Sequence, residues 1–237
     1  METSDAHRLV LWDIDLTLVD LRGLGGDWYR RALADIAGVP LRYVPAFPGR
    51  TERAITLELL AAHAVEASEE TVRRMWQRLV DISTESLPTL AERGRALPGA
   101  AAALATMAVR AGVVQTLVTG NLPEIARHKL SAFDLHGHID FEIGGYGSLS
   151  AERAELVAHA MARAAAKHGR EFPGTSVVVI GDTPHDVDAA LRHGATAIGV
   201  ATGRHGVAEL RDAGAHTVLT DLTETEAVVT AILAERE

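Results

Sequence analysis

The amino-acid sequence predicts an α/β fold, in which a parallel β-sheet is flanked by helices and a small helical insertion follows the first strand. Three observations support this prediction. Strand-like and helix-like segments alternate over residues 100–237, polar residues directly follow several strands, and residues 27–95 have a helical pattern of apolar residues. Strands that are separated by helices are joined by parallel crossovers, so we expect helices on both faces of the sheet.

The composition narrows the classes of protein to be considered. At 237 residues, with 47% hydrophobic and 23% charged residues, the chain suits one sizeable globular core, with or without a smaller insert. A net charge of −9 without a concentrated basic segment argues against nucleic-acid binding. The absence of cysteine excludes disulfides and thiolate metal sites and favours a cytoplasmic location. No recognisable signal peptide and no apolar run near the roughly 20 residues that span a bilayer is present, so we expect no membrane partner.

The first strand is expected at Arg8–Asp13, where an apolar run ends in two aspartates, Asp13 and Asp15. A buried carboxylate is costly unless it has a partner. Two carboxylates at the carboxyl end of an early strand, followed by the hydroxyl of Thr17, indicate a site for a cation and a phosphate group.

The insertion is expected to begin at the glycine-rich segment Gly23–Gly26, which we interpret as a flexible neck. The segment that follows has apolar residues at near-helical spacing and no convincing strand pattern, with a proline- and glycine-containing loop at 45–49. We therefore predict a core domain formed by residues 1–22 and 96–237 and a helical cap domain formed by residues 23–95.

The remainder of the chain alternates between the two kinds of element. Helices are expected at 100–110, 122–130, 151–167, 184–193 and 207–213 and from Thr223 onward. Strands are expected at 113–119, near 139–143, and at 176–180, 195–200 and 217–219. In parallel sheets of this kind ligands bind beyond the carboxyl ends of the strands, where the polar residues of this sequence gather.

Three motifs at strand ends carry a resemblance to a known family. They are Asp13-Ile14-Asp15-Leu16-Thr17, then Val118-Thr119-Gly120-Asn121, then Gly181-Asp182 with Asp186 four residues later. In these motifs and their order the chain resembles the phosphatase branch of the haloacid dehalogenase (HAD) superfamily, and phosphoglycolate-type phosphatases most closely. The resemblance spans nearly the whole chain and implies a Rossmann-like (HAD-like) sheet with a cap inserted after the first motif.

The same residues suit the hydrolysis of a phosphomonoester, which needs a nucleophile, a proton donor and a divalent cation. Asp13 would attack and form an aspartyl phosphate, and Asp15 would protonate the leaving group and then activate water. The carboxylates of Asp13, Asp182 and Asp186 would favour Mg²⁺. The resemblance adds the main-chain carbonyl of Asp15 as a further metal ligand.

Phosphate binding is expected at the end of the second motif strand. Thr119 would hydrogen-bond the phosphoryl group together with the main-chain N–H groups of Gly120 and Asn121. The family normally adds a lysine between the second and the last of these motifs, which residues 147–153 do not contain. We expect Arg153 to replace it, because a guanidinium group stays charged and grips phosphate in bidentate fashion. Lys129 is the alternative, although its neighbours indicate a solvated helix end.

Several of these residues also have structural explanations. Asp186 equally suits the first turn of a helix that begins after Thr183. Thr17, in the loop after Asp13, and Thr119, at a strand end, occupy positions where threonine commonly forms structural hydrogen bonds. A metal site at His136 and His138 is disfavoured because no third ligand accompanies them.

The cap is expected to close over the site and to select the substrate. The loop Pro48–Glu52 is the candidate contact with the leaving group, and Arg50 would read a second anionic group; a helix start capped by Thr51 explains the segment equally well. Three aromatic residues of the insertion are expected to pack within it rather than to stack on substrate: Trp28, Tyr29 and Trp76.

The sequence therefore predicts an enzyme, a Mg²⁺-dependent phosphatase for a small phosphorylated metabolite. The alternatives are a phosphomutase of the same superfamily, acting on a sugar phosphate, and a non-catalytic binding protein that retains the fold. The four intact aspartates disfavour the binding protein. A dehalogenase is disfavoured because that branch lacks the aspartate found here as Asp15, and a phosphonate hydrolase because the insertion contains no lysine.

Overall fold

The computed structural model describes residues 7–21 and 23–235, so the outer ends of the predicted core segments and Arg22 lie outside the described residues. Within them, a six-stranded parallel sheet has the strand order β5-β4-β1-β6-β7-β8. The strands are β1 (Arg8–Trp12), β4 (Val113–Thr119), β5 (Gly145–Tyr146), β6 (Val177–Gly181), β7 (Thr196–Val200) and β8 (Thr217–Leu219). The predicted parallel sheet is confirmed.

The register of the central strands explains where the polar residues meet. Trp12, the last residue of β1, pairs with Leu117 of β4 and with Ile180 of β6. Chain segments that leave these three strands therefore emerge at the same edge of the sheet. Asp13 follows β1 directly, and Asp182 follows β6 directly. Residues far apart in the sequence thus lie close together at this edge.

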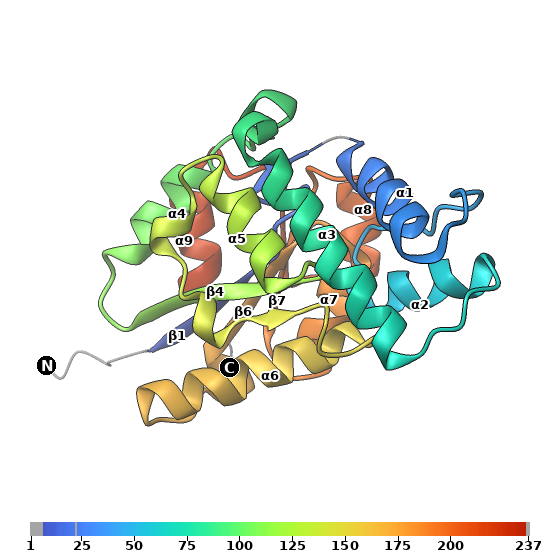
Figure 1. Cartoon of the computed structure of the whole chain (residues 1–237). Coiled ribbons are helices and arrows are strands. Elements are labelled where there is room, and N and C mark those ends of the chain that lie inside the picture. The colour runs from blue at the N-terminus through green and yellow to red at the C-terminus, as the bar shows by residue number, and fades with distance from the viewer. Residues whose placement is uncertain (1–6, 22, 236–237) are drawn as a thin grey trace, which may run out of the picture.

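Helices cover both faces of the sheet, and the alternation of side chains along β1 serves both layers. Val10 and Trp12 pack in one hydrophobic core, and Leu9 and Leu11 pack in the other. Figure 1 shows α6 along one face and α4, α5 and α9 on the opposite side. The first face carries α6 (Arg153–His168), α7 (Pro184–Leu191) and α8 (Val207–Asp212). The second carries α4 (Ala100–Ala108), α5 (Pro123–Ser131) and α9 (Thr225–Leu233).

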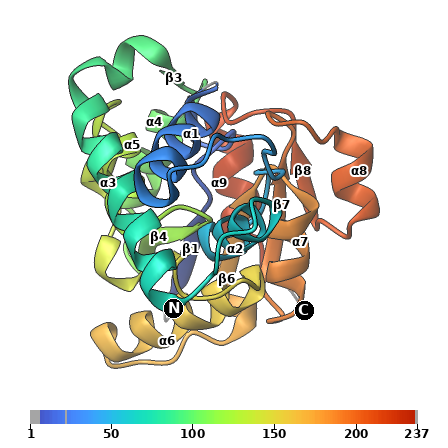
Figure 2. The same ribbon diagram turned by 45° about the vertical axis from the view of Figure 1, so that its right-hand side comes forward.

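The insertion after the first strand is helical, as predicted, and has its own hydrophobic core. Its helices are α1 (Leu24–Ala37), α2 (Glu52–Ala62) and α3 (Glu69–Leu90). Figures 1 and 2 both show α3 running past α1 and α5. Leu122 and Ile125, at the start of α5, belong to the same core, so the insertion packs directly on the helix that follows β4. The proposed boundaries of the cap domain, residues 23–95, stay a prediction.

Two local expectations are wrong. The segment Gly23–Gly26 is not a free neck: Gly23 takes a left-handed conformation (φ 75°) at the N-cap of α1, and the next three residues form its first turn. The strand expected near 139–143 is instead a 3₁₀ turn at Phe141–Ile143, followed by β5. Ile139 and Ile143 are buried and Phe141 is partly buried, which explains the misleading pattern. At Gly145 a Cβ would lie 2.1 Å from the Leu156 carbonyl oxygen, so only glycine lets β5 approach α6 this closely.

The chain also forms a short antiparallel ribbon that the sequence pattern does not reveal. β2 (Val19–Asp20) pairs with β3 (Arg95–Ala96), so the two connections to the insertion lie side by side. Three further 3₁₀ turns occur at Ala91–Arg93, His136–His138 and Gly174–Ser176. In the part of the chain that the structure describes, every helix is too short or too polar to span a bilayer.

Candidate active site

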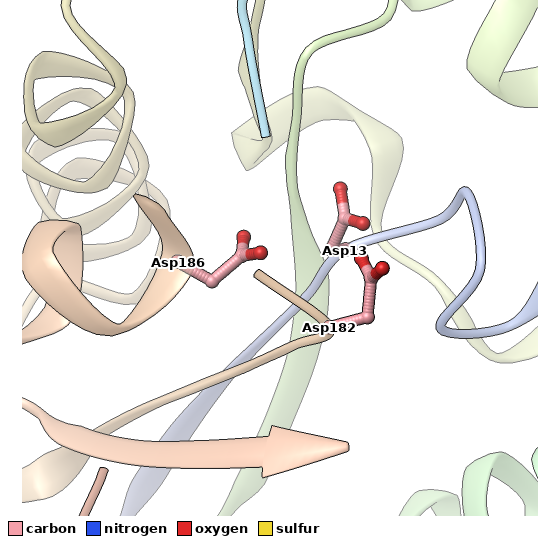
Figure 3. A group of neighbouring side chains, drawn as sticks. All are labelled: Asp13, Asp182 and Asp186. Carbon is pink, nitrogen blue, oxygen red and sulfur yellow. The ribbon is translucent and has the colours of Figure 1, made fainter. Parts of the chain in front are cut away.

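Three buried carboxylates meet at the carboxyl edge of the sheet (Figure 3). Asp13, Asp182 and Asp186 each have an oxygen atom within 4.8 Å of the others, and each side chain is nearly inaccessible to solvent. Oδ2 of Asp182 is buried and has no hydrogen-bond partner among the described residues. An unpartnered buried carboxylate oxygen is costly, and hard divalent cations prefer ligands of this kind. The residues therefore fit the expected Mg²⁺.

The close approach of these carboxylates depends on two glycines. A Cβ on Gly181 would lie 2.2 Å from Cγ of Asp186, and a Cβ on Gly203 would lie 1.7 Å from Oδ2 of Asp182. Any larger residue would displace a carboxylate from the cluster. The Gly-Asp pair of the third motif thus has a steric reason as well as a chemical one.

Asp186 serves the helix start and the carboxylate cluster at once. Its Oδ2 accepts hydrogen bonds from the main-chain N–H and the hydroxyl of Thr183, at 3.1 and 2.6 Å, and α7 begins with this capping box. Its Oδ1 accepts a hydrogen bond of 2.9 Å from Nε of Arg153. The structural explanation is therefore confirmed, and the capping box uses only Oδ2, so that Oδ1 bonds to Arg153 within the site.

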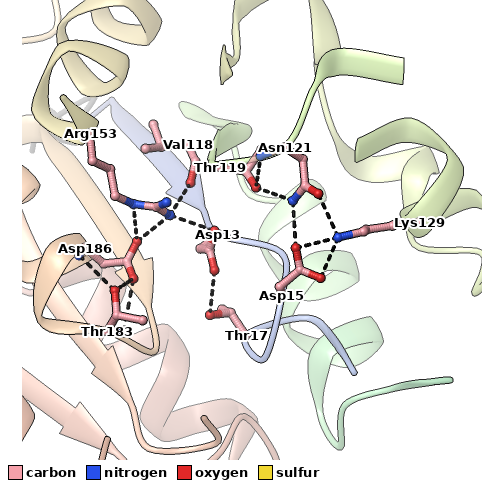
Figure 4. Close-up of polar contacts among 10 residues, drawn as sticks. All are labelled: Asp13, Asp15, Thr17, Val118, Thr119, Asn121, Lys129, Arg153, Thr183 and Asp186. Carbon is pink, nitrogen blue, oxygen red and sulfur yellow. Dashed lines mark hydrogen bonds and ion pairs between the residues drawn. The ribbon is translucent and has the colours of Figure 1, made fainter. Parts of the chain in front are cut away.

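Arg153, the first residue of α6, lies between Asp13 and Asp186 (Figure 4). Its Nη2 donates to Oδ1 of Asp13 at 2.7 Å and lies 2.6 Å from Oδ1 of Asp186. It also donates to the carbonyl of Val118 at 3.2 Å. The guanidinium thus occupies the place in which the sequence led us to expect it. Its role in binding phosphate stays a prediction.

Burial and mutual repulsion perturb the titration of this cluster. Burial raises the pKa of Asp13 to about 7, with Arg153 opposing the shift and Asp186 adding to it. Burial, together with the charges of Asp13 and Asp186, raises the pKa of Asp182 to about 9. Burial would lower the pKa of Arg153, but the two carboxylates beside it raise that pKa above its usual range. One guanidinium does not neutralise three ionised carboxylates, so ionisation of the whole cluster favours the binding of a further positive charge.

Asp15 faces away from the cluster. Nζ of Lys129 donates to Oδ1 and Oδ2 of Asp15 at 2.7 and 2.6 Å, and Nδ2 of Asn121 donates to Oδ2 at 2.8 Å. The Asp15 side chain is 45% exposed, whereas that of Lys129 is 12% exposed. The interpretation of Lys129 as a solvated helix end is therefore wrong. Lys129 stands one helical turn after Ile125, which packs on the insertion, and this i to i+4 spacing is the signal that could have placed it at the site.

The expected phosphate-binding residues lie at the end of β4. The hydroxyl of Thr119 is buried and accepts hydrogen bonds from the main-chain N–H and Nδ2 of Asn121, at 3.3 and 2.8 Å. The carbonyl of Gly120 accepts from the main-chain N–H of Glu52 at 2.8 Å. A Cβ on Gly120 would lie 2.0 Å from the carbonyl oxygen of Arg50. This strand end is therefore in direct contact with the loop of the insertion.

Thr17 lies behind the proposed nucleophile. Its hydroxyl donates to Oδ2 of Asp13 over a long distance of 3.5 Å, in agreement with a structural role. The turn between Asp15 and Thr17 contains Leu16 in a left-handed conformation (φ 62°), which is unusual for a residue with a branched side chain.

A cavity of about 680 Å³ lies over these residues. The insertion lines it with Trp28, Tyr29 and Phe47, among others, and the core lines it with Asp13, Asp15 and Thr119. Trp28 and Tyr29 are also buried in the core of the insertion, as predicted, so they pack and line the cavity at once. Trp76, the third aromatic residue, is half-buried and donates to the hydroxyl of Thr56.

Arg50 also lines the cavity, but its charge is already paired. Its Nη1 lies 2.5 Å from Oε2 of Glu58, and the guanidinium is within 3.5 Å of the carbonyls of Ala46 and Ala54. Recognition of a second anionic group by Arg50 stays a prediction, and it would have to compete with Glu58. Thr51 accepts a hydrogen bond from the main-chain N–H of Ala54 and caps α2, which confirms the structural explanation of this segment.

His136 and His138 are exposed in a 3₁₀ turn. Within residues 7–21 and 23–235, the three aspartates form the only group of three or more histidine, aspartate or glutamate side chains within reach of one metal ion.

Comparisons with known proteins bear on the family and the fold of the chain. The sequence model of the haloacid dehalogenase-like hydrolase family matches residues 10–191. No curated protein matches the sequence significantly. A hydrolase from Pseudomonas syringae is 23% identical, the match covering 96% of this chain and 100% of that one, with a TM-score of 0.67. A protein described as a putative beta-phosphoglucomutase from Bacteroides vulgatus is 20% identical, the match covering 98% of this chain and 92% of that one, with a TM-score of 0.65. A predicted phosphoglycolate phosphatase from Haemophilus somnus is 15% identical, the match covering 97% of this chain and 100% of that one, with a TM-score of 0.64. At these identities the structural matches establish the fold.

Proposed function

Because the chain belongs to the haloacid dehalogenase-like hydrolase family, we propose that it is a Mg²⁺-dependent phosphatase that hydrolyses a small phosphorylated metabolite through an aspartyl phosphate on Asp13. One observation carries this proposal. Asp13 belongs to a buried carboxylate cluster, whereas the nearby carboxylate of Asp15 is bonded to Lys129 and Asn121 instead (Figure 4). Such a separation suits a division between a nucleophile and an acid/base group.

In the first step, an oxygen of Asp13 attacks phosphorus and the bond between phosphorus and the leaving oxygen breaks. Asp15 donates a proton to that oxygen as it departs. In the second step, Asp15 takes a proton from water, whose oxygen attacks phosphorus, and Asp13 is regenerated with release of inorganic phosphate. A Mg²⁺ held by Asp13, Asp182, Asp186 and the carbonyl of Asp15 would neutralise charge on the phosphoryl oxygens.

The other residues of the site support the same reaction. Arg153 keeps Asp13 oriented through its bond to Oδ1, and its charge lies beside the place where negative charge develops. The buried Thr119 hydroxyl and the main-chain N–H groups of Gly120 and Asn121, just before the start of α5, would bind the phosphoryl group. The cavity under the insertion would hold the leaving group and exclude water.

The proposal is tested with a panel of phosphorylated metabolites, assayed with and without Mg²⁺, for the parent protein and Asp13→Asn. Loss of the nucleophile should lower phosphate release on the order of 10⁴-fold or more. The exposed Asp188, which pairs with Arg192 on the surface, provides the control Asp188→Asn, which should keep parent activity. Mass spectrometry of the quenched reaction should find phosphate on Asp13.

Undiminished release by Asp13→Asn would contradict the aspartyl-phosphate mechanism. The same assay separates the phosphomutase alternative: isomerisation of a sugar phosphate without net release of phosphate would replace the hydrolase proposal. Failure to turn over any ester with Mg²⁺ present would favour the binding-protein alternative.

A further inference from the structure

Lys129, Asn121 and Asp15 form a closed triangle of hydrogen bonds at the edge of the cavity (Figure 4). Nζ of Lys129 donates to both carboxylate oxygens of Asp15 and, at 2.7 Å, to Oδ1 of Asn121. Nδ2 of Asn121 in turn donates to Asp15, and its side chain thereby closes the triangle. The three residues come from the loop after β1, the end of β4 and helix α5, so the triangle ties three separate elements together.

The triangle leaves Lys129 no donor for a phosphate group. A lysine ammonium has three N–H donors. Here all three have partners, namely Oδ1 and Oδ2 of Asp15 and Oδ1 of Asn121. The Lys129 side chain is also largely buried, so its position is fixed by neighbouring residues. Arg153, in contrast, already stands beside Asp13. The two cations of the site therefore contact different carboxylates: Lys129 contacts Asp15, and Arg153 contacts Asp13.

The triangle also decides which way the Asp15 carboxylate points. Without a partner on this side, a carboxylate two residues from Asp13 could turn toward a cation held by the aspartate cluster. With both oxygens bonded to Lys129, the side chain is held away from Asp13, Asp182 and Asp186 and toward the cavity. Asn121 links this arrangement to the phosphate-binding strand end, because its Nδ2 also donates to Thr119 at 2.8 Å.

We infer that Lys129 is a positioning residue that acts through Asp15: with Asn121, it holds the proposed acid/base carboxylate at the leaving-group side of the cavity. This inference rests on the proposed phosphatase function and deepens it. Lys129 makes no contact with the phosphoryl group in this arrangement, and its contribution is confined to the steps that need Asp15. Proton donation to the leaving oxygen is one such step, and it matters most for poor leaving groups.

The experiment compares two esters. A primary alkyl phosphate has a poor leaving group that needs a proton, whereas p-nitrophenyl phosphate has a good one that does not. The ratio kcat/KM reports the steps up to release of the alcohol or phenol. Lys129→Met should lower kcat/KM on the order of 10²-fold for the alkyl ester and by no more than about threefold for p-nitrophenyl phosphate.

The chain provides a matched control, because its only other lysine is Lys167. Lys167 pairs with Asp140 and Glu142 at the surface, so Lys167→Met should leave both ratios unchanged. Retained activity on p-nitrophenyl phosphate shows at the same time that Lys129→Met is folded. A second measurement places Lys129→Met in an Asp15→Asn background, where it should have no further effect on the alkyl ester.

Three results would each overturn the positioning role of Lys129. They are an equal loss of kcat/KM for both esters, no loss for either, and a full additional loss for the alkyl ester in the Asp15→Asn background. Lack of phosphate release from both esters by the parent protein with Mg²⁺ would instead contradict the proposed function and the inference with it. The failures of the two proposals are thus distinguishable.

Discussion

At the scale of single residues, the arginine that we expect to replace the family's usual lysine is well matched to its surroundings. Arg153 is buried and spans Asp13 and Asp186, and it also reaches the carbonyl of Val118. A lysine has one nitrogen, whereas the planar guanidinium contacts several acceptors in fixed directions. Burying three carboxylates around this group is tolerable because its charge offsets part of theirs.

Removal of this side chain should therefore affect the reaction strongly. Arg153→Ala should cost about 2–4 kcal/mol of transition-state stabilisation, because it deletes a buried cation beside the phosphoryl site. Arg153→Lys should recover part of the loss, since it restores charge but not the two-pronged contact. The measurement is kcat/KM, with Arg163→Ala as the control on an exposed position of the same helix. Activity of Arg153→Ala within twofold of the parent would show that the guanidinium does not bind the phosphoryl group.

Gly203 packs directly against the carboxylate of Asp182. A Cβ at this position would lie 1.7 Å from Oδ2 of Asp182, so Gly203→Ala must displace that carboxylate. Displacement of one ligand should weaken Mg²⁺ affinity by about 10–100-fold, the range found when groups that orient metal ligands are altered. Mg²⁺ titration by calorimetry measures the effect. Gly137→Ala is the control because nothing lies within 4 Å of its added Cβ. Equal affinities for the two variants would show that Asp182 is not a ligand.

The residue scale also shows what sequence reasoning can reach. Arg153 could be anticipated because a missing lysine leaves few basic residues in the right segment. Lys129 could not be assigned correctly from His128 and Leu130, its immediate neighbours. Its environment depends on α5 packing against the insertion through Leu122 and Ile125, which is a contact between segments far apart in sequence. The roles of all these residues stay predictions until the variants are measured.

At the scale of elements, a buried hydrogen bond ties α1 to α2 beside the cavity. The hydroxyl of Tyr29 donates to Oε1 of Glu52 at 2.6 Å, and Thr56 donates to the same oxygen. Burial raises the pKa of Glu52, while these two hydrogen bonds oppose the shift. Burial and the neighbouring Glu52 charge raise the pKa of Tyr29 well above its usual range, so the phenol keeps its proton and serves as the donor.

Tyr29→Phe should lower the free energy of unfolding by about 1–3 kcal/mol, because it removes a partner from a buried carboxyl group. Tyr43→Phe is a matched control, since Tyr43 makes a hydrogen bond to Glu58 at an exposed position and its loss should cost less than about 0.5 kcal/mol. Denaturant unfolding followed by circular dichroism measures both. Similar losses for the two variants would mean that the link between α1 and α2 adds nothing specific to stability.

Elements with a strong local pattern were predictable, and those set by tertiary contacts were not. β4 and β8 match the expected ranges to the residue, because each is a β-rich run bounded by turn residues. β5 was misplaced because its two residues, Gly145 and Tyr146, carry no strand pattern, and its position depends on close contact with α6. The ribbon of β2 and β3 is likewise too short to leave a periodic signal.

At the scale of the whole molecule, the sheet assembles a site from segments that lie far apart along the chain. Asp13, Thr119 and Asp182 each follow or end a strand of the central trio β4-β1-β6. Hydrophobic periodicity predicts that these strands are buried on both faces, but it contains no information on which strands are neighbours. The predicted fold class is therefore confirmed, whereas the strand order could be learned only from the structure.

The accumulation of carboxylates at this edge should make the stability of the metal-free protein depend on pH. The pKa of Asp182 is raised from 3.8 to about 9 and that of Asp13 from 3.8 to about 7. Between pH 3.8 and pH 9 the folded state therefore binds more protons than the unfolded state. Protonation of these two carboxyl groups stabilises the fold fully below about pH 4, and this stabilisation is lost as pH rises toward 9. One excess bound proton corresponds to a slope of about 1.4 kcal/mol per pH unit.

We therefore expect the free energy of unfolding without Mg²⁺ to fall, on the order of 1 kcal/mol per pH unit, from pH 6 to pH 8.5. Asp182→Asn should flatten this dependence, because the amide does not titrate, whereas the surface variant Asp188→Asn should keep it. We expect saturating Mg²⁺ to bind the ionised cluster. It should therefore stabilise the parent more at pH 8.5 than at pH 6 and should stabilise Asp182→Asn less at both pH values. Denaturant unfolding at the two pH values, with Mg²⁺ or with a chelator, provides the measurement. Two results would contradict this expectation: a stability of the parent that rises with pH in the chelator, or an equal gain from Mg²⁺ at both pH values. Either would show that the buried aspartates do not hold protons that the cation displaces.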